Sequence, residues 1–244
     1  MASAAAQRDI PPDIVFGHDA WPSSVEDGAA FLIDKPKGLT SFDVVERVRA
    51  GSGVTKVGHA GTLDPLATGL LIVLVARPAT RLQEAFMHLP KTYEGTMRFG
   101  ERTPSHDAET EVTERADVSG LSREDIEDVC DQFRGEIQQV PPMYSAVKVD
   151  GERLYQKARR GETVERPPRQ VQIDELEILD WARPEMRFRV SCSKGTYLRS
   201  LARDLGEALD VGAHLGALRR TRIGPYAVSS AWPLQALEQA LSQT

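Results

Sequence analysis

The segment from Lys56 to Gly69 has the composition of a loop that presents a reactive carboxylate. It contains three glycines and a single acidic residue, Asp64, and an apolar run follows it directly. Glycine permits tight backbone paths, and Pro65 restricts Asp64 to extended backbone, so the carboxylate would be held on a stiff loop. Such a group can act as a nucleophile, as a general base or as a partner for developing positive charge. The alternative is that Asp64 only caps a turn.

Two apolar runs and a helix are predicted to position this loop. Residues 29–34 (AAFLID) have the length of a strand, and residues 70–76 (LLIVLVA) are typical of a strand buried on both faces. A helix should follow, because Thr40 or Ser41 can cap it and three apolar residues recur at helical spacing: Phe42, Val45 and Val48. The loop would therefore lie between elements of one core.

The rest of the chain alternates irregularly between strands and helices. Strands are predicted at residues 91–99, 171–179 and 186–190, and helices at residues 122–133 and 196–209. There is neither an even βα alternation nor an internal repeat. This pattern predicts an α+β fold with a mixed, mostly antiparallel central sheet flanked by helices and loops.

Composition narrows the class of protein. At 244 residues, 41% hydrophobic and 27% charged, the chain resembles an average soluble domain. Its longest apolar run is about a third of the roughly 20 residues that a membrane-spanning helix needs, so no membrane association is expected. Cys130 and Cys192 have no CxxC spacing, which disfavours a disulfide framework and a structural zinc site. We expect a cytoplasmic protein.

The first 28 residues are predicted to be an N-terminal tail. They lack the basic and apolar regions of a signal peptide. Ile14, Val15 and Phe16 are candidates for attaching this tail to a core.

The net charge of −6 at first argues against a polyanionic partner, but the charge is segregated along the chain. Residues 101–136 contain 12 acidic and 4 basic residues, a net charge of −8. Residues 147–170 and 194–222 each carry +3. Either basic stretch is a candidate for binding nucleic acid, and the alternative is a solvated helix face.

Five ordered motifs carry a resemblance to a known family. They are residues 34–41 (DKPKGLTS), 58–69 (GHAGTLDPLATG), 91–95 (KTYEG), 141–148 (PPMYSAVK) and the pair 193–206 (SKGTYLRSLARDLG) and 212–222 (GAHLGALRRTR). Together they resemble the TruB family of tRNA pseudouridine synthases, which convert uridine 55 in the T-loop of tRNA to pseudouridine. The resemblance implies a pseudouridine synthase fold and an isomerase.

The family's catalytic aspartate corresponds to Asp64. The reaction breaks the bond between ribose C1′ and uracil N1, turns the base over and rejoins it through C5. A carboxylate can stabilise positive charge at C1′, attack C1′ as a nucleophile, or remove a ribose proton to open a glycal route, and the sequence leaves these three open. An isomerisation needs no cofactor or metal, and neither GxxxxGK[ST] nor GxGxxG occurs.

The resemblance assigns substrate-binding roles to further residues. Tyr93 would stack on the target uracil, Arg199 would pair with the catalytic carboxylate, and Tyr197 and Leu218 would line the pocket. On residue type alone, Tyr93 is an ordinary strand aromatic and Arg199 an exposed helix arginine. His59 is assigned to the RNA, filling a stack that flipped bases vacate, although a histidine before glycine is more often a turn residue.

Other assigned residues lie outside the pocket. Lys35, in the first motif, is assigned to the substrate. Residues 148–169 resemble a thumb-like insertion that folds over the T-arm. Its basic residues would bind phosphates: Lys148, Arg153, Lys157, Arg159, Arg160 and Arg166. The loop around His106 has no assigned role, and a solvated loop is expected there.

The resemblance also suggests a domain plan and partners. Residues 29–244 would form one catalytic domain, and the usual C-terminal RNA-binding PUA domain is not expected because the family motifs end near Tyr226. We expect a monomer that acts on the T-arm stem-loop of tRNA without guide RNA. Three alternatives remain open: a tRNA-folding factor, a guide-RNA-dependent relative, and a carboxylate-dependent glycosidase.

Overall fold

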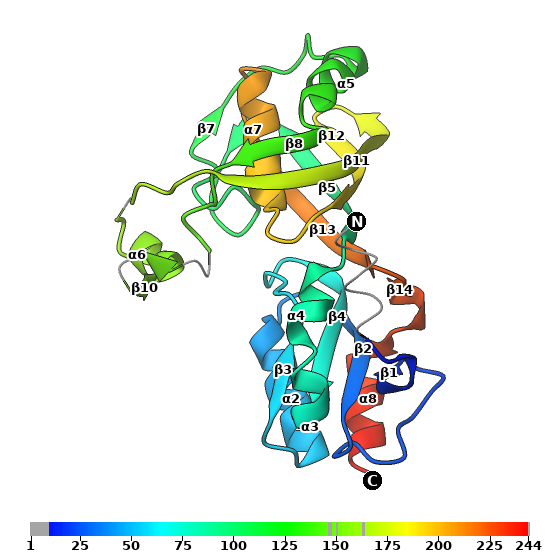
Figure 1. Cartoon of the computed structure of the whole chain (residues 1–244). Coiled ribbons are helices and arrows are strands. Elements are labelled where there is room, and N and C mark those ends of the chain that lie inside the picture. Colours follow the sequence, from blue (N-terminus) through cyan, green and yellow to red (C-terminus); the bar gives the residue numbers. More distant parts are fainter. Residues whose placement is uncertain (1–9, 146–147, 150, 163, 244) are drawn as a thin grey trace. The chain divides into compact units, whose positions relative to one another are not determined.

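The computed structural model describes residues 10–145, 148–149, 151–162 and 164–243. The chain forms two compact units (Figure 1). Unit 1 comprises Met1–Glu94 and Leu218–Thr244, and unit 2 comprises Gly95–Ala217. The boundaries fall within two strands, β5 (Lys91–Phe99) and β13 (Ala213–Ile223).

Unit 1 is built on the antiparallel pair of β2 and β4, in register from Ala29 opposite Val75 to Lys35 opposite Gly69. The strand order is β1-β2-β4-β13, with β3 beside β4, β14 beside β13 and β15 beside β2. Besides β5 and β13, its elements are η1 (Pro12–Ile14), β1 (Val15–Phe16), β2 (Ala29–Lys35), α2 (Ser41–Ser52), β3 (Val57–His59), β4 (Thr68–Val75), α3 (Ala76–Thr80), α4 (Gln83–His88), β14 (Tyr226–Ala227), η2 (Val228–Ser230), β15 (Trp232–Pro233) and α8 (Leu234–Leu241).

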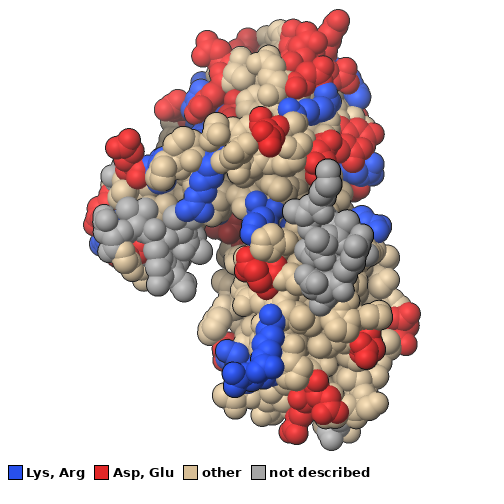
Figure 2. Space-filling view, in the orientation of Figure 1, with Lys and Arg blue, Asp and Glu red and all other residues tan. Residues whose placement is uncertain are grey.

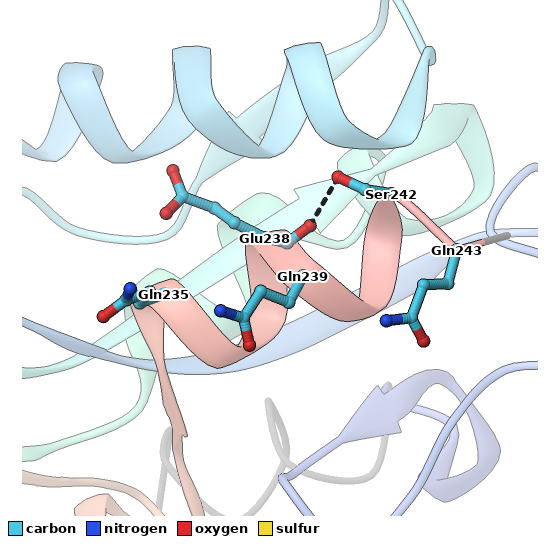
Figure 3. A pocket seen from close by; sticks show the side chains of 5 residues that line it. All are labelled: Gln235, Glu238, Gln239, Ser242 and Gln243. Atoms are coloured by element: carbon cyan, nitrogen blue, oxygen red, sulfur yellow. Dashed lines mark hydrogen bonds between the residues drawn. The ribbon is translucent and has the colours of Figure 1, made fainter.

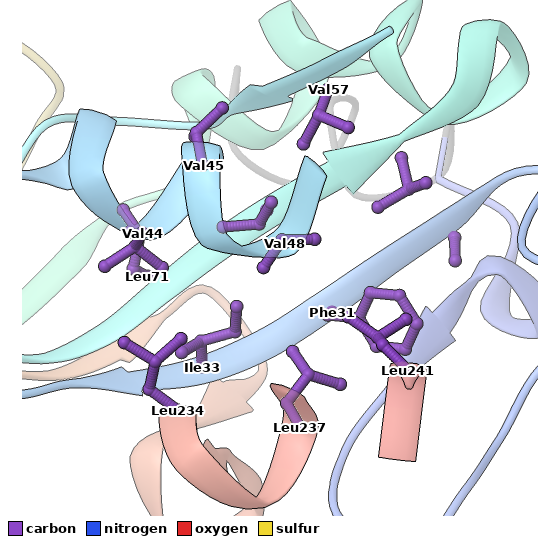
Figure 4. Close-up of a cluster of buried hydrophobic side chains, with 13 residues drawn as sticks. Phe31, Ile33, Val44, Val45, Val48, Val57, Leu71, Leu234, Leu237 and Leu241 are labelled. Carbon is purple, nitrogen blue, oxygen red and sulfur yellow. The ribbon is translucent and has the colours of Figure 1, made fainter. Parts of the chain in front are cut away.

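Helices cover both faces of this strand pair, as the unbroken apolar run of β4 predicts. Phe31, Ile33 and Leu71 face α2 and α8, where they meet Val44, Val45, Val48, Leu234, Leu237 and Leu241 (Figure 4). Alternate residues such as Leu70 and Ile72 face the opposite cluster, which contains Phe86 of α4. Each large aliphatic side chain buried in this way contributes roughly 1.5–3 kcal/mol, so β4 is a rigid base for the loop that precedes it.

The described part of the predicted N-terminal tail is attached to this core, and its first nine residues lie outside the described part. Val15 and Phe16 pair in parallel with Ala30 and Phe31 of β2. The ring of Trp21 lies 5.5 Å from that of Phe31. The attachment through Val15 and Phe16 is therefore present in the structure.

Unit 2 contains a sheet in the order β5-β12-β11-β8, with α5 and α7 packed together beside it. The pairs β11–β12 and β11–β8 are antiparallel. Its elements are β6 (Glu101–Arg102), β7 (Glu114–Arg115), α5 (Arg123–Gln132), β8 (Gly135–Gln139), β9 (Lys148–Val149), β10 (Glu152–Arg153), α6 (Leu154–Arg159), β11 (Arg169–Ala182), β12 (Glu185–Cys192) and α7 (Leu198–Ala208). The α+β class with a mixed, mostly antiparallel sheet is confirmed.

The acidic stretch of residues 101–136 lies in unit 2 and includes α5. Figure 2 shows acidic side chains gathered over the end of this unit that carries α5. Ser122 caps α5 through the backbone N–H of Asp125, as predicted. A large part of the negative charge of the chain therefore lies on this end of unit 2.

One prediction about the core is wrong. Phe42 was expected on the buried face of α2 with Val45 and Val48, but it is 62% exposed. The residues of α2 that are buried are Ser41, Val44, Val45 and Val48. With 3.6 residues per turn, these four side chains project from one side of the helix. Phe42 projects just outside that side, next to Val45.

Candidate functional site

Asp64 lies in unit 1, in the loop that joins β3 to β4, and its side chain is half-buried. Its carbonyl accepts a hydrogen bond from the N–H of Ala67 at 3.1 Å, so the residue begins a turn. Gly61 and Gly69 both adopt positive φ, at 103° and 101°. At Gly69 a Cβ would lie 2.3 Å from the carbonyl oxygen of Arg220, so only glycine allows β13 to pack this close.

The outer side of the loop is held by the N-terminus of α2. The Ser41 hydroxyl accepts a hydrogen bond from the N–H of Leu63 at 2.8 Å and donates one to the carbonyl of Leu63 at 3.1 Å. The N–H of Gly38 donates to the carbonyl of Pro65 at 2.8 Å. A capping box between Thr40 and Asp43 fixes the start of α2. The residues on both sides of Asp64 are therefore anchored through their backbones.

Ser41→Ala is expected to destabilise the protein by about 2 kcal/mol, because it leaves the buried N–H and carbonyl of Leu63 without the hydroxyl that satisfies them. Urea denaturation measures the change. The matched control is Ser52→Ala at the other end of α2, where the hydroxyl makes only weak contacts at 3.3 and 3.5 Å. Equal destabilisation by the two variants would contradict the anchoring role.

The inner side of the loop is held by Arg220, which is only 1% exposed. Its guanidinium donates to the carbonyls of Leu70 at 2.7 Å, Gly61 at 3.0 Å and Thr62 at 3.5 Å. Strand register explains this reach, because β13 pairs in parallel with β4 and places Arg220 opposite Gly69. A guanidinium suits the position because it carries several donors in a fixed plane.

The sequence analysis did not identify Arg220, which lies in a stretch interpreted only as basic. One signal could have found it. Arg220 lies two residues after Leu218, itself a predicted site residue, within the motif of residues 212–222.

His59 ends β3 and lies just before the loop. Burial is the main cause that lowers its pKa, and the positive charge of Arg220 lowers it further. Its Nδ1 atom is buried without a hydrogen-bond partner among the described residues. The imidazole is therefore neutral at pH 7. The backbone carbonyl of His59 accepts a hydrogen bond from the side chain of Gln83 at 2.8 Å.

Tyr93 and Leu218 lie on strands next to this loop within unit 1. Tyr93 is a buried residue of β5, and the Thr221 hydroxyl of β13 donates to the carbonyl of Thr92 at 3.2 Å. Leu218 comes one residue before the Arg219–Thr68 pair, and so lies opposite the end of the Asp64 loop. Three neighbouring strands therefore carry these residues: Asp64 directly precedes β4, Leu218 lies on β13 and Tyr93 lies on β5.

Lys35 ends β2 and is fully buried. Its ammonium donates to the carbonyls of Pro36 at 3.0 Å and Leu39 at 2.6 Å. In this position it holds the turn that precedes α2, and its role in substrate binding remains a prediction.

A hollow of unit 1 lies along α8 and is lined by Gln235, Glu238, Gln239, Ser242 and Gln243 (Figure 3). The Ser242 hydroxyl in this hollow donates to the backbone carbonyl of Glu238 at 2.9 Å. The lining groups include one carboxylate and neither a histidine nor a cysteine, so this hollow lacks the paired groups of an acid–base site.

Arg199 belongs to unit 2, where it is 5% exposed in α7. Its guanidinium lies 3.6 Å from the carboxylate of Asp107 and donates to the carbonyls of Tyr144 at 2.8 Å and Ser105 at 3.4 Å. It is therefore not an exposed helix arginine. Its pairing with Asp64 remains a prediction, as does the pocket role of Tyr197, whose N–H donates to the side chain of Gln139.

The prediction of a solvated loop around His106 is correct for Pro104, Ala108 and Glu109, which are exposed. It is wrong for Thr103, Ser105 and Asp107, which are buried. The Asp107 carboxylate accepts hydrogen bonds from the Ser105 hydroxyl and from the N–H of Glu109, and the loop pairs with Leu215 of β13. Polar composition suggested exposure, but these polar groups satisfy one another inside the fold.

The predicted thumb-like insertion contains β9, β10 and α6. The structure gives the backbone, and not the side chains, of Lys148 in β9, Arg153 in β10 and Arg159 at the end of α6. Arg160 is exposed, and its guanidinium binds the carboxylates of Glu152 and Glu162, both at 2.6 Å. These carboxylates raise the pKa of Arg160 and neutralise its charge locally.

Family models match the whole length from residue 49 onwards. The model described as TruB family pseudouridylate synthase (N terminal domain) matches residues 49–198. The model described as tRNA pseudouridylate synthase B C-terminal domain matches residues 199–244. The family similarity therefore continues beyond Tyr226, where the motifs recognised in the sequence ended.

Curated relatives match over most of the chain. tRNA pseudouridine synthase B of Mycobacterium sp. (strain KMS) is 48% identical over 214 residues, which cover 86% of this chain and 72% of that protein. The protein of the same name from Phocaeicola vulgatus is 43% identical over 224 residues, covering 89% of this chain and 95% of that one.

A solved structure described as a Cbf5-Nop10-Gar1 complex contains a chain with a TM-score of 0.69 and 31% identity. The match covers 94% of this chain and 59% of that one, so this chain spans about six tenths of that protein's length. A second, described as an H/ACA RNP bound to a substrate RNA containing 2′-deoxyuridine, has a TM-score of 0.65 and 28% identity, with coverage of 94% and 59%. Among the residues that the structure describes, no helix has the length and apolar character needed to cross a membrane.

Proposed function

The chain belongs to the TruB family of pseudouridylate synthases, and we propose that it converts uridine 55 in the T-loop of tRNA to pseudouridine, with Asp64 as the catalytic carboxylate. One observation carries the proposal. The single acidic residue of the β3–β4 loop is held by backbone anchors on both sides, from Ser41 outside and Arg220 inside. Catalysis benefits from a group that is fixed before the substrate arrives.

The proposed reaction exchanges one bond for another at ribose C1′. The C1′–N1 bond breaks, the uracil turns over, the C1′–C5 bond forms, and the proton on C5 passes to solvent as N1 gains one. Asp64 would offset positive charge at C1′, bond to C1′ as a nucleophile or take the C2′ proton, each within the chemistry of a carboxylate. Every heavy atom of the substrate is retained and the proton lost from C5 is balanced by the one gained at N1, so no oxidant or reductant is required.

Neighbouring side chains of unit 1 would hold the flipped base. Tyr93 offers an aromatic ring, and stacking of a base on such a ring is worth about 1–3 kcal/mol. Leu218 would add apolar contact on the neighbouring strand. His59 is neutral, so it would contact RNA as a flat ring rather than as a cation. These contacts would offset the few kcal/mol needed to flip a paired or stacked base.

The proposed substrate is tRNA, which the names of the curated relatives specify, and we propose that no guide RNA takes part. We propose that Lys148, Arg153 and Arg159 bind phosphates of the T-arm. Arg160 would contribute less, because two carboxylates already occupy its guanidinium. Because the substrate is a soluble RNA, we place the enzyme in the cytoplasm.

The test is tritium release from a T-arm stem-loop RNA labelled at uracil C5. The wild-type protein is expected to release tritium from this RNA. A control RNA that has cytidine in place of uridine 55, and carries tritium at C5 of its other uracils, is expected to release none. Mapping of pseudouridine in the product gives the modified position. Absence of release from the first RNA would refute the activity, and modification at another uridine would refute the assigned position.

A further inference from the structure

Arg219 of β13 and Asp34 of β2 form a bidentate ion pair, the cross-strand pair, within unit 1. The two terminal nitrogens of the guanidinium donate to the two carboxylate oxygens at 3.0 and 2.7 Å. β4 lies between the two strands, and its first residue, Thr68, is opposite Arg219. The same guanidinium donates to the Thr68 hydroxyl at 3.4 Å. The cross-strand pair therefore spans β4 at the point where the Asp64 loop enters it.

The pairing of β13 with β4 is short, and it is the pairing that places Leu218 against the Asp64 loop. It consists of the positions of Arg219 and Arg220, and the second of these is opposite Gly69. A short ladder that includes a glycine fixes strand register only weakly. The cross-strand pair adds a side-chain constraint at the same place, because it ties β13 to β2 on the other side of β4.

Solvent exposure makes the cross-strand pair a weak source of stability. The side chains of Arg219 and Asp34 are 42% and 34% exposed. Charges at such positions are screened by water, and holding two side chains in one geometry costs entropy. The contact is directional all the same, because two parallel hydrogen bonds fix the orientation of both groups. The pair is therefore better suited to setting the position of β13 against β2 than to stabilising the fold.

We propose that the cross-strand pair is a positioning device for the isomerisation, which holds Leu218 in register with the Asp64 loop. This inference rests on the proposed function. Arg219 acts through Leu218, its neighbour on β13, and through the Thr68 hydroxyl at the end of the loop. Neither member of the pair contacts the reacting atoms. A misplacement of about 1 Å can cost about 100-fold in rate, so a partial loss of register lowers the rate while the protein stays folded.

The test measures tritium release and affinity for a T-arm stem-loop in Asp34→Asn, in Arg219→Gln and in the double variant. Each single variant is expected to lower the rate at saturating RNA about tenfold and to change the affinity by less than about threefold. The double variant should be no slower than the slower single variant, because each substitution already breaks the same contact. The matched control is the ion pair of Arg47 and Glu238 in the same unit, which is 3.6 Å apart and similarly exposed. Arg47→Gln should keep the rate within about twofold of wild type.

A direct contact between Arg219 and an RNA phosphate would give a different pattern and would overturn the inference. Arg219→Gln would then weaken RNA binding and reduce the slope of log K against log salt by about 1. Asp34→Asn would free the guanidinium and strengthen binding instead. Unchanged rates in both single variants would also overturn the inference, as would a loss in the double variant equal to the product of the two single losses.

Amide hydrogen exchange tests the same contact without any activity. Both single variants are expected to exchange faster than wild type in residues 68–70 and 218–221, and Arg47→Gln is not. Unchanged exchange there would overturn the inference. If the wild-type protein releases no tritium, the proposed function fails, and the exchange result alone decides whether the pair sets the register of β13. Where Asp34→Asn does not fold, Asp34→Glu takes its place, because it keeps the charge, lengthens the side chain and should lower the rate in the same way.

Discussion

Asp64→Asn is expected to abolish isomerisation while leaving the fold and RNA binding intact. Asparagine has nearly the size of aspartate, but it neither ionises nor attacks C1′, and it does not take a proton at neutral pH. The rate of tritium release at saturating RNA should fall by about 10³-fold or more, the range for loss of an acid–base group or nucleophile. RNA affinity should change by less than threefold, because phosphate contacts dominate it.

The structure explains why this variant should still fold. The backbone around position 64 is held by Ser41, Gly38 and Arg220, and the turn is closed by the carbonyl of Asp64 itself, all of which the substitution preserves. The control is Asp13→Asn, an exposed carboxylate of the same unit that is outside the loop. Activity of Asp64→Asn within tenfold of wild type would contradict the catalytic assignment.

The same assay separates the routes open to Asp64. Only the glycal route breaks the C2′–H bond, so deuterium at ribose C2′ would slow tritium release by that route alone. A nucleophilic route instead places a covalent bond between Asp64 and C1′, and quenched reactions would contain an RNA–protein adduct. A carboxylate that only balances charge would give neither signal.

The Asp64 loop could be predicted because its information is local. Three glycines, the Asp–Pro step and the apolar run of β4 lie within one short segment, and the glycine at position 69 has the positive φ that its type permits. The family resemblance then supplied the expected pseudouridine synthase fold, which is confirmed by similarity to solved structures. The predicted strands and helices followed from apolar periodicity in the same local way.

What could not be predicted depends on contacts between distant parts of the sequence. The loop around His106 looks solvated because it is polar, yet Thr103, Ser105 and Asp107 are buried, and Asp107 pairs with Leu215. The pairing of Arg199 with Asp64 stays a prediction, and the structure shows another carboxylate near Arg199, that of Asp107 in this same loop. Neither contact is visible in a local pattern, because each joins segments that are far apart along the chain.

Arg160 and Arg166 illustrate the same limit for charge. Both lie in a stretch with a net charge of +3, and sequence alone treats their positive charges as equivalent. In the structure Arg160 is neutralised by Glu152 and Glu162, whereas Arg166 keeps a donor without an acceptor. The net charge of a stretch therefore does not identify which of its side chains are already paired with carboxylates.

Arg220→Met is expected to destabilise the protein by about 3 kcal/mol and to lower activity together with stability. Methionine fills much of the same space but donates no hydrogen bond, so the buried carbonyls of Gly61 and Leu70 lose their partners. Each lost bond to a charged donor is worth about 1.5–3 kcal/mol. Because Gly61 belongs to the loop of Asp64, the carboxylate would also lose its fixed position.

Two matched variants make this prediction specific to the loop. Arg222→Met removes the same group from an exposed position of the same strand. There the guanidinium donates to the carbonyl of Pro225 at 3.3 Å, so stability should change by less than about 0.5 kcal/mol. Arg220→Lys keeps the charge, but a single ammonium cannot reach all the carbonyls that the guanidinium contacts, so it should recover stability only in part. Urea denaturation gives the free energies, and tritium release at temperatures where each variant is folded gives the activity. A folded Arg220→Met with wild-type activity would show that Asp64 keeps its position without this contact, and the anchoring of the loop would then rest on Ser41 and Gly38.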